Sequence, residues 1–209
     1  MADLQLQDLV KKYTVLDFET TGLTKPAPVS LGIMVYENNK RVHYDYFECN
    51  PEKEIEEGAF RTHHIPQERV DQLPNFSEFW SRVQPYIEGY LIIGHNVKYD
   101  LNSVLIPTLQ RYGIAVPTII RLCTCENARK LGLDTELNAK GKHKYDLEAC
   151  CKYFGIEIEN HHHAAYDIYM TQRVFAKEYN MNKVNLDIVT IEVDYNPFNG
   201  EKAEELLPF

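Results

Sequence analysis

A run of strand-forming residues that ends on two acids constrains this chain more than any other feature. The segment Tyr13–Glu19 (Tyr-Thr-Val-Leu-Asp-Phe-Glu) has the pattern of a buried β-strand, and Thr21-Gly22 ends it. Because side chains two apart in a strand share a face, Asp17 and Glu19 are expected to project together. Adjacent carboxylates repel each other, and a hard divalent cation relieves that repulsion. The alternative is a pair of solvated acids at a strand end.

The remaining pattern predicts one α/β domain. Residues 29–36 and 42–47 are expected to form two further strands around an Asn38-Asn39 hairpin turn, and residues 90–94 and 118–123 form short buried strands. Apolar spacing predicts helices over residues 76–87, 100–112, 124–131, 146–154 and 164–178, with prolines bending or shortening the first two. A three-stranded antiparallel meander followed by alternating helices and strands indicates a mixed β-sheet flanked by helices.

Composition places this domain among cytoplasmic proteins. The chain has 209 residues, of which 44% are hydrophobic, enough for a single core. Its longest apolar runs are too short to span a bilayer, and its first residues do not resemble a secretory signal. Five cysteines, an odd number, indicate reduced thiols, and their spacing fits no zinc ribbon or knuckle. We therefore expect a cytoplasmic protein that does not bind membranes.

Two further clusters carry chemically active side chains. In Gly94–Asp100 a strand ends and Asp100 begins a helix, where its charge suits the positive end of the helix dipole. In His161–Asp167 a histidine lies just before a helix, and Asp167 lies more than one turn into it. Taken singly, Asp100 is explained as a helix cap, and the histidine run as a fortuitous nickel-binding stretch or a surface His–Asp contact.

Together, the three clusters resemble the exonuclease motifs of the DEDDh family, also called DnaQ-like or RNase H-like exonucleases. The likeness lies in their order, spacing and context: Asp-Phe-Glu-Thr-Thr-Gly in the first strand, Gly-His-Asn-x-x-x-Asp at a strand–helix junction, and His-x-Ala-x-x-Asp in the last helix. The connecting segments 64–76 and 146–156 are similar too, so the resemblance runs from about Lys12 to Tyr179. It implies an RNase H-like fold.

The resemblance also implies which residues form the active site. Asp17, Glu19, Asp100 and Asp167 would hold two Mg²⁺ or Mn²⁺ ions, with Asp17 bridging them. Two metals roughly 3.5–4 Å apart can stabilise both the attacking and the leaving oxygen of a phosphodiester. His162 would act as the general base on the attacking water, a task suited to a side chain with an unperturbed pKa of about 6.5. The products would be nucleoside 5′-monophosphates.

One question of register stays open between two histidines. The family's histidine lies five residues before the last aspartate, which selects His162 and places Ala164 correctly. A sister subclass has a tyrosine four residues before that aspartate, and His163 occupies the position here. Because Ala164 fits only the first alignment, we expect His162 to be the base.

Substrate contacts follow from the same resemblance. The backbone around Thr20, Thr21 and Gly22, with Leu23, is expected to cradle the terminal nucleotide. Tyr99 and His64 are expected to stack on or bond to the last nucleotides, since aromatic faces hold bases without reading sequence. Core packing is the alternative for Leu23 and Tyr99. A basic loop, Lys140–Lys144, either guides the strand or is simply solvated. The residues expected to bind substrate are Thr20, Thr21, Gly22, Leu23, His64, Asn96 and Tyr99.

Charge limits how this protein meets nucleic acid. The last 25 residues carry a net −5, which leaves −4 of the total −9 for the other 184 residues. Such a balance argues against tight binding along a duplex but not against holding a few nucleotides at one end. We therefore expect a 3′→5′ exonuclease acting on single-stranded or frayed DNA, as in proofreading, repair or end trimming. A 3′→5′ exoribonuclease and a catalytically inactive nucleic-acid-binding module are the alternatives.

The expected domain organisation is an exonuclease domain over residues 1–182 followed by an acidic extension over residues 183–209. The extension lies outside the resemblance, and it is expected to be a docking tail or a junction to another domain. Members of the family work in replication, repair, RNA-processing or CRISPR-adaptation assemblies, which makes such an assembly the expected partner beside the nucleic acid.

Overall fold

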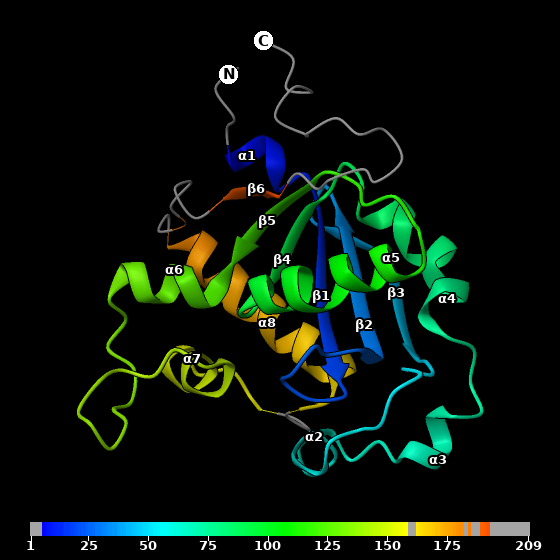
Figure 1. Ribbon diagram of the computed structural model, residues 1–209. Helices are drawn as coiled ribbons and strands as arrows, with labels where there is room; N and C mark the ends of the chain where they lie inside the picture. Colours follow the sequence, from blue (N-terminus) through cyan, green and yellow to red (C-terminus); the bar gives the residue numbers. More distant parts are fainter. Residues whose placement is uncertain (1–5, 159–161, 182–183, 185–188, 193–209) are drawn as a thin grey trace.

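A six-stranded mixed sheet, in the order β3-β2-β1-β4-β5-β6, forms the centre of the protein (Figure 1). The structure is a computed structural model, and it describes residues 6–158, 162–181, 184 and 189–192. The strands are β1 (Lys12–Thr20), β2 (Pro28–Glu37), β3 (Lys40–Glu48), β4 (Leu91–Gly94), β5 (Ile119–Cys123) and β6 (Thr190–Glu192).

The first three strands form the predicted antiparallel meander. Asn38 and Asn39 connect β2 to β3 with positive φ values of 48° and 64°, the backbone that a tight two-residue hairpin turn requires. β4 and β5 then run parallel to β1, and β6 closes the sheet antiparallel to β5. The predicted fold class is confirmed. Residues 190–192, expected in the C-terminal extension, belong to this sheet, whereas residues 193–209 lie outside the described residues.

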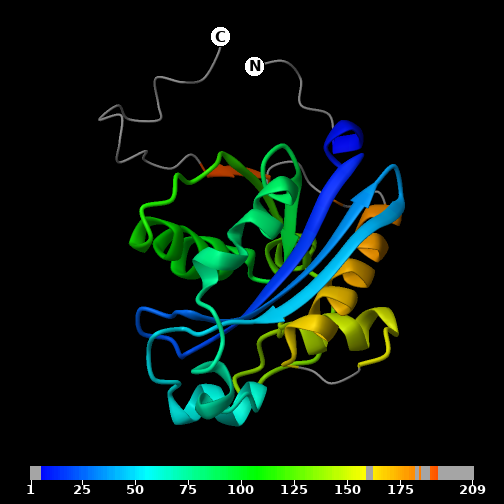
Figure 2. The same ribbon diagram turned by 90° about the vertical axis from the view of Figure 1, so that its right-hand side faces the viewer.

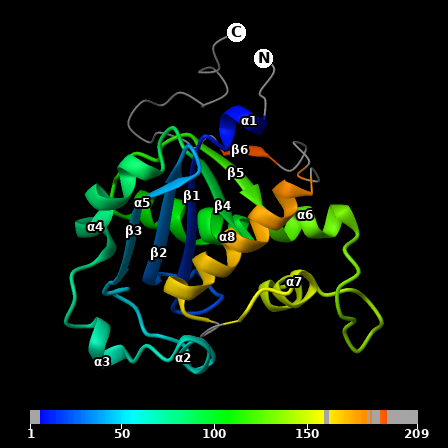
Figure 3. The ribbon, with the colours of Figure 1, turned by 180° about the vertical axis from the view of Figure 1, so that it is seen from behind.

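Helices cover both faces of the sheet, as Figure 2 shows from the side. Helix α8 (Ala164–Asn180) crosses one face, where Val15 of β1 packs in a cluster with Ile168 and Phe175 (Figure 3). Leu16 of β1 belongs to the core on the opposite face. That face is covered by α4 (Phe76–Val83), a π-helix (η2, Tyr99–Leu105) and α5 (Ile106–Arg111).

Helix ends largely follow the expected signals. α4 gives way at Val83 to a 3-10 helix, η1 (Gln84–Tyr86), which contains Pro85. Asp146 caps α7 (Leu147–Phe154) by accepting a hydrogen bond from the Ala149 N–H. Gly132 ends α6 (Thr124–Leu131), and a second glycine ends α7, both in the left-handed conformation. The pattern did not predict α1 (Leu6–Leu9), α2 (Glu57–His63) or α3 (Gln67–Val70).

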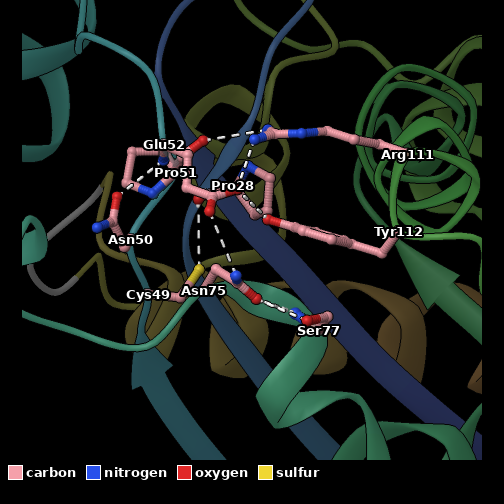
Figure 4. A network of polar contacts seen from close by, with 9 residues as sticks. All are labelled: Pro28, Cys49, Asn50, Pro51, Glu52, Asn75, Ser77, Arg111 and Tyr112. Atoms are coloured by element: carbon pink, nitrogen blue, oxygen red, sulfur yellow. Dashed lines mark hydrogen bonds and ion pairs between the residues drawn. The ribbon is translucent and has the colours of Figure 1, made fainter.

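A polar network holds the segment between β3 and α2 against the helices (Figure 4). The Glu52 carboxylate accepts hydrogen bonds from Arg111 and from the Tyr112 hydroxyl, which follow each other at the end of α5. The Asn75 amide, at the start of α4, donates to the other Glu52 oxygen at 3.4 Å. These contacts fix the segment that leads to α2, which lies beyond the end of β1 (Figure 1).

None of the helices in the described part of the chain is long and apolar enough to cross a membrane.

Candidate active site

The end of β1 brings its two carboxylates to the face of the sheet that α8 covers. Asp17 and Glu19 alternate with Leu16 and Phe18, which pack in the core on the other face. Asp17 lies opposite Gly32 of β2 in the strand register. A Cβ atom at Gly32 would lie only 2.5 Å from the Ala164 carbonyl oxygen, so the start of α8 rests directly on β2.

This close approach places the last aspartate of the sequence motifs beside the first two acids. One carboxylate oxygen each of Asp17, Glu19 and Asp167 lies within 4.8 Å of the others. Oδ2 of Asp167 accepts a hydrogen bond from the His162 N–H at 3.2 Å. Oδ1 of Asp167 is buried, and no hydrogen-bond partner reaches it from the described residues. A buried acceptor without a donor is suited to a cation.

Asp100 brings a fourth carboxylate from the π-helix. It is 4% exposed, and its Oδ1 accepts a hydrogen bond from the backbone N–H of Phe18 at 3.1 Å. The bond ties the π-helix to β1 between the two β1 acids. It lowers the pKa of Asp100, but burial outweighs it and raises that pKa to about 7. π-helical turns are uncommon and frequently occur at functional sites.

All four acids have a raised pKa. For Asp17, burial is the largest cause, followed by the charges of Asp100, Asp167 and Glu19. Burial likewise comes first for Glu19, whose pKa rises to about 8, and for Asp167, where the His162 N–H acts in the opposite direction. The carboxylates therefore resist being charged together. An all-oxygen set with a donor-free acceptor fits hard divalent cations such as Mg²⁺ or Mn²⁺.

The two described histidines of the last motif point to different surroundings. His162 has φ 68°, is exposed, and lines the cavity over the carboxylates. His163 is the N-cap of α8, where its Nδ1 accepts from the Ala165 N–H at 3.3 Å. Its ring lies 4.9 Å from that of Tyr46, and His163 does not line the cavity. His161 lies outside the described residues.

A cavity of about 890 Å³ opens over the carboxylates between α2 on one side and α6 and α7 on the other. Five of the seven residues expected to bind substrate line it: Thr20, Gly22, Leu23, Asn96 and Tyr99. The Leu23 side chain is 84% exposed. The Tyr99 hydroxyl donates to the Gly22 carbonyl at 2.8 Å and lies 3.1 Å from the Thr20 hydroxyl, so Tyr99 also braces the loop after β1.

Thr21 and His64 do not line the cavity. Thr21 is fully buried, and its hydroxyl accepts from the Ala27 N–H at 3.1 Å, which stabilises the loop between β1 and β2. His64 ends α2 in the left-handed conformation and is exposed, with its ring edge against Phe60. The side chains of Thr21 and His64 therefore lie away from the cavity, and contact of either residue with the substrate stays a prediction.

His63, rather than its neighbour His64, faces the cavity. It lines the cavity and is 6% exposed, and burial lowers its pKa. Its Nδ1 accepts from the Ile65 N–H at 3.0 Å, which leaves Nε2 to carry the proton of a neutral ring. Locating the end of α2 would have separated the two histidines, but the sequence pattern did not predict that helix.

The far wall of the cavity comes from α6 and the segment before α7. It consists of Cys125, Arg129, Tyr145, Asp146 and Leu147. His95, from the second motif, holds this wall in place. One of its ring nitrogens lies 2.8 Å from the Thr124 hydroxyl and the other 2.8 Å from the Tyr145 carbonyl oxygen.

Two other expectations concern side chains outside the carboxylate cluster. All five cysteines are free, and none belongs to the metal-binding group found among the described residues. The basic loop does not line the cavity, and its Lys144 pairs with Glu136 at 3.0 Å.

Comparison with protein families gives one match that spans most of the chain. The family model RNase_T, described as an exonuclease, matches residues 14–175. Among curated proteins, the PolC-type DNA polymerase III of Staphylococcus aureus is 28% identical over 176 residues. That alignment covers 82% of this chain but only 12% of the polymerase, so the chain spans about an eighth of this relative.

Solved structures share the fold at low sequence identity. Exonuclease X in complex with 5′ overhanging duplex DNA superposes with a TM-score of 0.65 at 20% identity, covering 84% of this chain and 96% of the other. Cell-death related nuclease 4 gives 0.70 at 17% identity, with 87% and 66% covered. Exonuclease I of E. coli in complex with a dT13 oligonucleotide gives 0.67 at 19% identity, with 83% and 41% covered.

Proposed function

The chain belongs to the RNase_T exonuclease family, and from this premise we propose that it is a two-metal-ion 3′→5′ exonuclease that releases nucleoside 5′-monophosphates. The observation that carries the proposal is the set of four carboxylates that meet at the end of β1, three of them buried and all with a raised pKa. Acids that resist being charged together are stabilised by cations. A nuclease of this kind uses the same cations to stabilise the charge that develops when a phosphodiester is cleaved.

In this mechanism Asp17, Glu19, Asp100 and Asp167 hold two Mg²⁺ or Mn²⁺ ions. When bound, the ions supply positive charge to the attacking and leaving oxygens of the scissile phosphate. The backbone bond between His162 and Asp167 keeps the histidine next to the carboxylates. Its exposed imidazole lines the cavity and takes the proton from the attacking water.

The terminal nucleotide binds beside the end of β1. Gly22, Leu23 and Tyr99 line this part of the cavity, and Thr20 and Asn96 lie on the same side. Leu23 offers an exposed apolar side chain against which a base can pack. The Tyr99 hydroxyl, bonded to the Gly22 carbonyl, keeps this loop in place for the substrate.

We favour single-stranded or frayed DNA as the substrate. Unpairing a terminal nucleotide from a duplex costs a few kcal/mol, so free strands are bound more easily. Exonuclease X and exonuclease I, which share the fold and whose solved structures are complexes with DNA, support DNA over RNA. An exoribonuclease remains the alternative because recognition of the 2′-OH depends on pocket details. The complete set of four acids and His162 argues against an inactive binding module.

We also propose a partner assembly and a cellular location for this protein. The likeness to part of a DNA polymerase III supports a role in a replication or repair assembly; CRISPR adaptation is the alternative. The sequence predicts the exonuclease domain at residues 1–182, and β6 adds residues 190–192 to the sheet of that domain. We propose that the acidic residues after β6 dock to such an assembly or join another domain. Five free cysteines are compatible with the cytoplasm.

The test is a time course on DNA and RNA oligonucleotides labelled at either end, with Mg²⁺, Mn²⁺ or EDTA. We expect a 5′ label to give a ladder that shortens by single nucleotides, and a 3′ label to appear at once as a mononucleotide. The controls are a 3′-blocked oligonucleotide, which wild-type protein should leave intact, and the Asp17→Asn variant, which should leave every oligonucleotide intact. Cleavage of a circular single strand would contradict exonuclease action, and cleavage in EDTA would contradict the metal mechanism.

A further inference from the structure

One guanidinium lines the cavity, and the other lining residues with a fixed charge are acids. Of the lysines and arginines in the described part of the chain, Arg129 of α6 is the one that lines the cavity. The acidic lining residues are Asp17, Glu19, Glu56, Asp146 and Asp167. A nucleic acid strand brings one negative charge per nucleotide into this space. Once cations neutralise the carboxylates at the end of β1, the phosphates beyond the scissile one still need a positive partner.

The Arg129 guanidinium is available for such a phosphate. Its residue is exposed, and in the described part of the chain no carboxylate lies within 4.0 Å of its nitrogens. Its polar contact there is a weak one, from Nη2 to the Cys125 sulfur at 3.7 Å. Other arginines are engaged: Arg61, Arg69, Arg82, Arg111 and Arg121 each pair with a carboxylate.

An aromatic ring accompanies this cation on the same wall. The Cζ atom of Arg129 lies 5.8 Å from the centroid of the Tyr145 ring, a cation–π arrangement that holds the guanidinium over the ring. The backbone of Tyr145 is fixed by its hydrogen bond with His95. The nearby acid, Asp146, is occupied by capping α7. The wall therefore presents a positioned cation and a ring, the pair that binds a phosphate and packs against a sugar or base.

We propose that Arg129 and Tyr145 form a second nucleotide subsite, in which Arg129 binds a backbone phosphate on the 5′ side of the scissile one. This inference rests on the proposed function, which puts the terminal nucleotide on the opposite side of the cavity, at Gly22, Leu23 and Tyr99. The strand leaves that side past the carboxylates and meets the wall formed by α6. Arg129 is a binding residue for substrate and takes no proton.

The test measures binding without hydrolysis. Wild-type protein, Arg129→Ala and Lys130→Ala are titrated in Ca²⁺ against a 5′-fluorescein oligonucleotide, and the Kd is read from fluorescence anisotropy. Lys130 is the matched control, because it is an exposed cation on the same helix that does not line the cavity. We expect Arg129→Ala to raise the Kd about 5- to 50-fold and Lys130→Ala to change it about twofold or less.

A second series locates the phosphate. Oligonucleotides with one uncharged methylphosphonate at each of the last three linkages are titrated against wild type and Arg129→Ala. At one linkage on the 5′ side of the scissile bond, the wild type should lose about the same factor as the Arg129→Ala substitution costs. Arg129→Ala should lose nothing further there. This non-additivity identifies direct contact, because a merely structural role would leave the methylphosphonate effect unchanged.

Three outcomes overturn the inference: equal losses for Arg129→Ala and Lys130→Ala, a methylphosphonate effect that is the same in Arg129→Ala and wild type, or no measurable binding by the wild type. The proposed function fails separately. If the wild type binds as expected but hydrolyses no oligonucleotide in Mg²⁺ or Mn²⁺, the exonuclease assignment is wrong and the phosphate contact stands.

Discussion

At the scale of single residues, adjacent side chains of like chemistry take different places. His162 and His163 differ because the positive φ of His162 turns the chain just before α8 begins. One ring is left exposed at the cavity, while the other caps the helix and packs on Tyr46. Mutating each histidine separately therefore tests whether His162 or His163 is the general base.

We expect His162→Ala to lower the turnover rate by roughly 10²–10⁴-fold, the usual contribution of general base catalysis. Metal and substrate affinity should change little, and the acidic limb of the pH–rate profile should disappear. His163→Ala should stay within a few-fold of wild type in rate but lower the free energy of unfolding by about 0.5–2 kcal/mol, because it removes the N-cap of α8. A large rate loss in His163→Ala with a near-normal His162→Ala would reverse the assignment.

The four raised carboxylate pKa values predict how stability depends on pH in the metal-free protein. A carboxyl whose pKa is higher in the folded than in the unfolded state lowers stability by almost nothing below about pH 3, where it is protonated in both states. The loss of stability grows as the pH rises through the unfolded value toward the folded value. Asp17 and Glu19 therefore destabilise the folded protein increasingly as the pH rises above about 4. For Glu19 this continues up to its folded pKa of about 8. Asp17→Asn removes one of these charges and the repulsion it causes.

We expect Asp17→Asn to raise the free energy of unfolding by roughly 1–3 kcal/mol at pH 8 in EDTA, and by much less, about 0.5 kcal/mol or below, at pH 4. Denaturant titrations at the two pH values measure the difference. Asp134→Asn is the control, because the Asp134 side chain is 94% exposed, and this variant should match wild type at both values. A gain for Asp17→Asn that is equal at pH 4 and pH 8 would show that charge repulsion is not its cause.

At the scale of elements, the approach of α8 to β2 decides whether the site forms. Asp167 lies in α8, and two of its partner acids lie in β1, so the helix must rest close to the sheet. Gly32 allows this, because a Cβ there would come within 2.5 Å of the Ala164 carbonyl oxygen. Helix position and carboxylate geometry are coupled through this one contact.

Gly32→Ala is expected to lower the free energy of unfolding by about 1–3 kcal/mol, the typical cost of overpacking. It should also reduce exonuclease activity more than tenfold, since a shift of about 1 Å in catalytic geometry costs about 10²-fold. Gly58→Ala is the stability control. No neighbouring atom lies within 4 Å of its Cβ position, and alanine favours helix α2, so stability should be unchanged or higher. Wild-type stability and activity in Gly32→Ala would show that α8 adjusts without consequence.

At the scale of the whole molecule, the carboxylates join elements far apart in the sequence. β1, the π-helix and α8 each contribute acids, and the hydrogen bond between Asp100 and Phe18 is one direct link between β1 and the π-helix. Divalent cations bound here would connect all three elements, and binding to the folded state alone stabilises it.

We expect Mg²⁺ or Mn²⁺ at about 100 times its Kd to stabilise the wild type by about 2.7 kcal/mol. For a chain of this length that corresponds to a rise in Tm of about 5–10 °C. Differential scanning fluorimetry with and without metal measures it, and Ca²⁺ tests selectivity. The rise should be lost in Asp17→Asn and Asp167→Asn but kept in Asp134→Asn. An equal rise in all variants would place the metal elsewhere.

The sequence by itself determined the local elements and the identity of the acids. The alternation in β1 and the Asn38-Asn39 turn each depend on residues close in sequence, and the structure confirms them. The spacing of the three motifs predicted the family, which the match over residues 14–175 confirms. Patterns of this kind can be read from sequence because backbone preference and strand or helix periodicity are local properties.

Only the tertiary structure decided which neighbours face the cavity. His63 rather than His64, the burial of Thr21, and Arg129 on the far wall all depend on where α2 and α6 pack relative to β1. No local pattern distinguishes these side chains from their neighbours. Their direction is set by a left-handed residue at the end of α2, a loop hydrogen bond and the packing of distant segments. Such contacts join residues far apart in the chain, so they exist only once the sheet and helices have assembled.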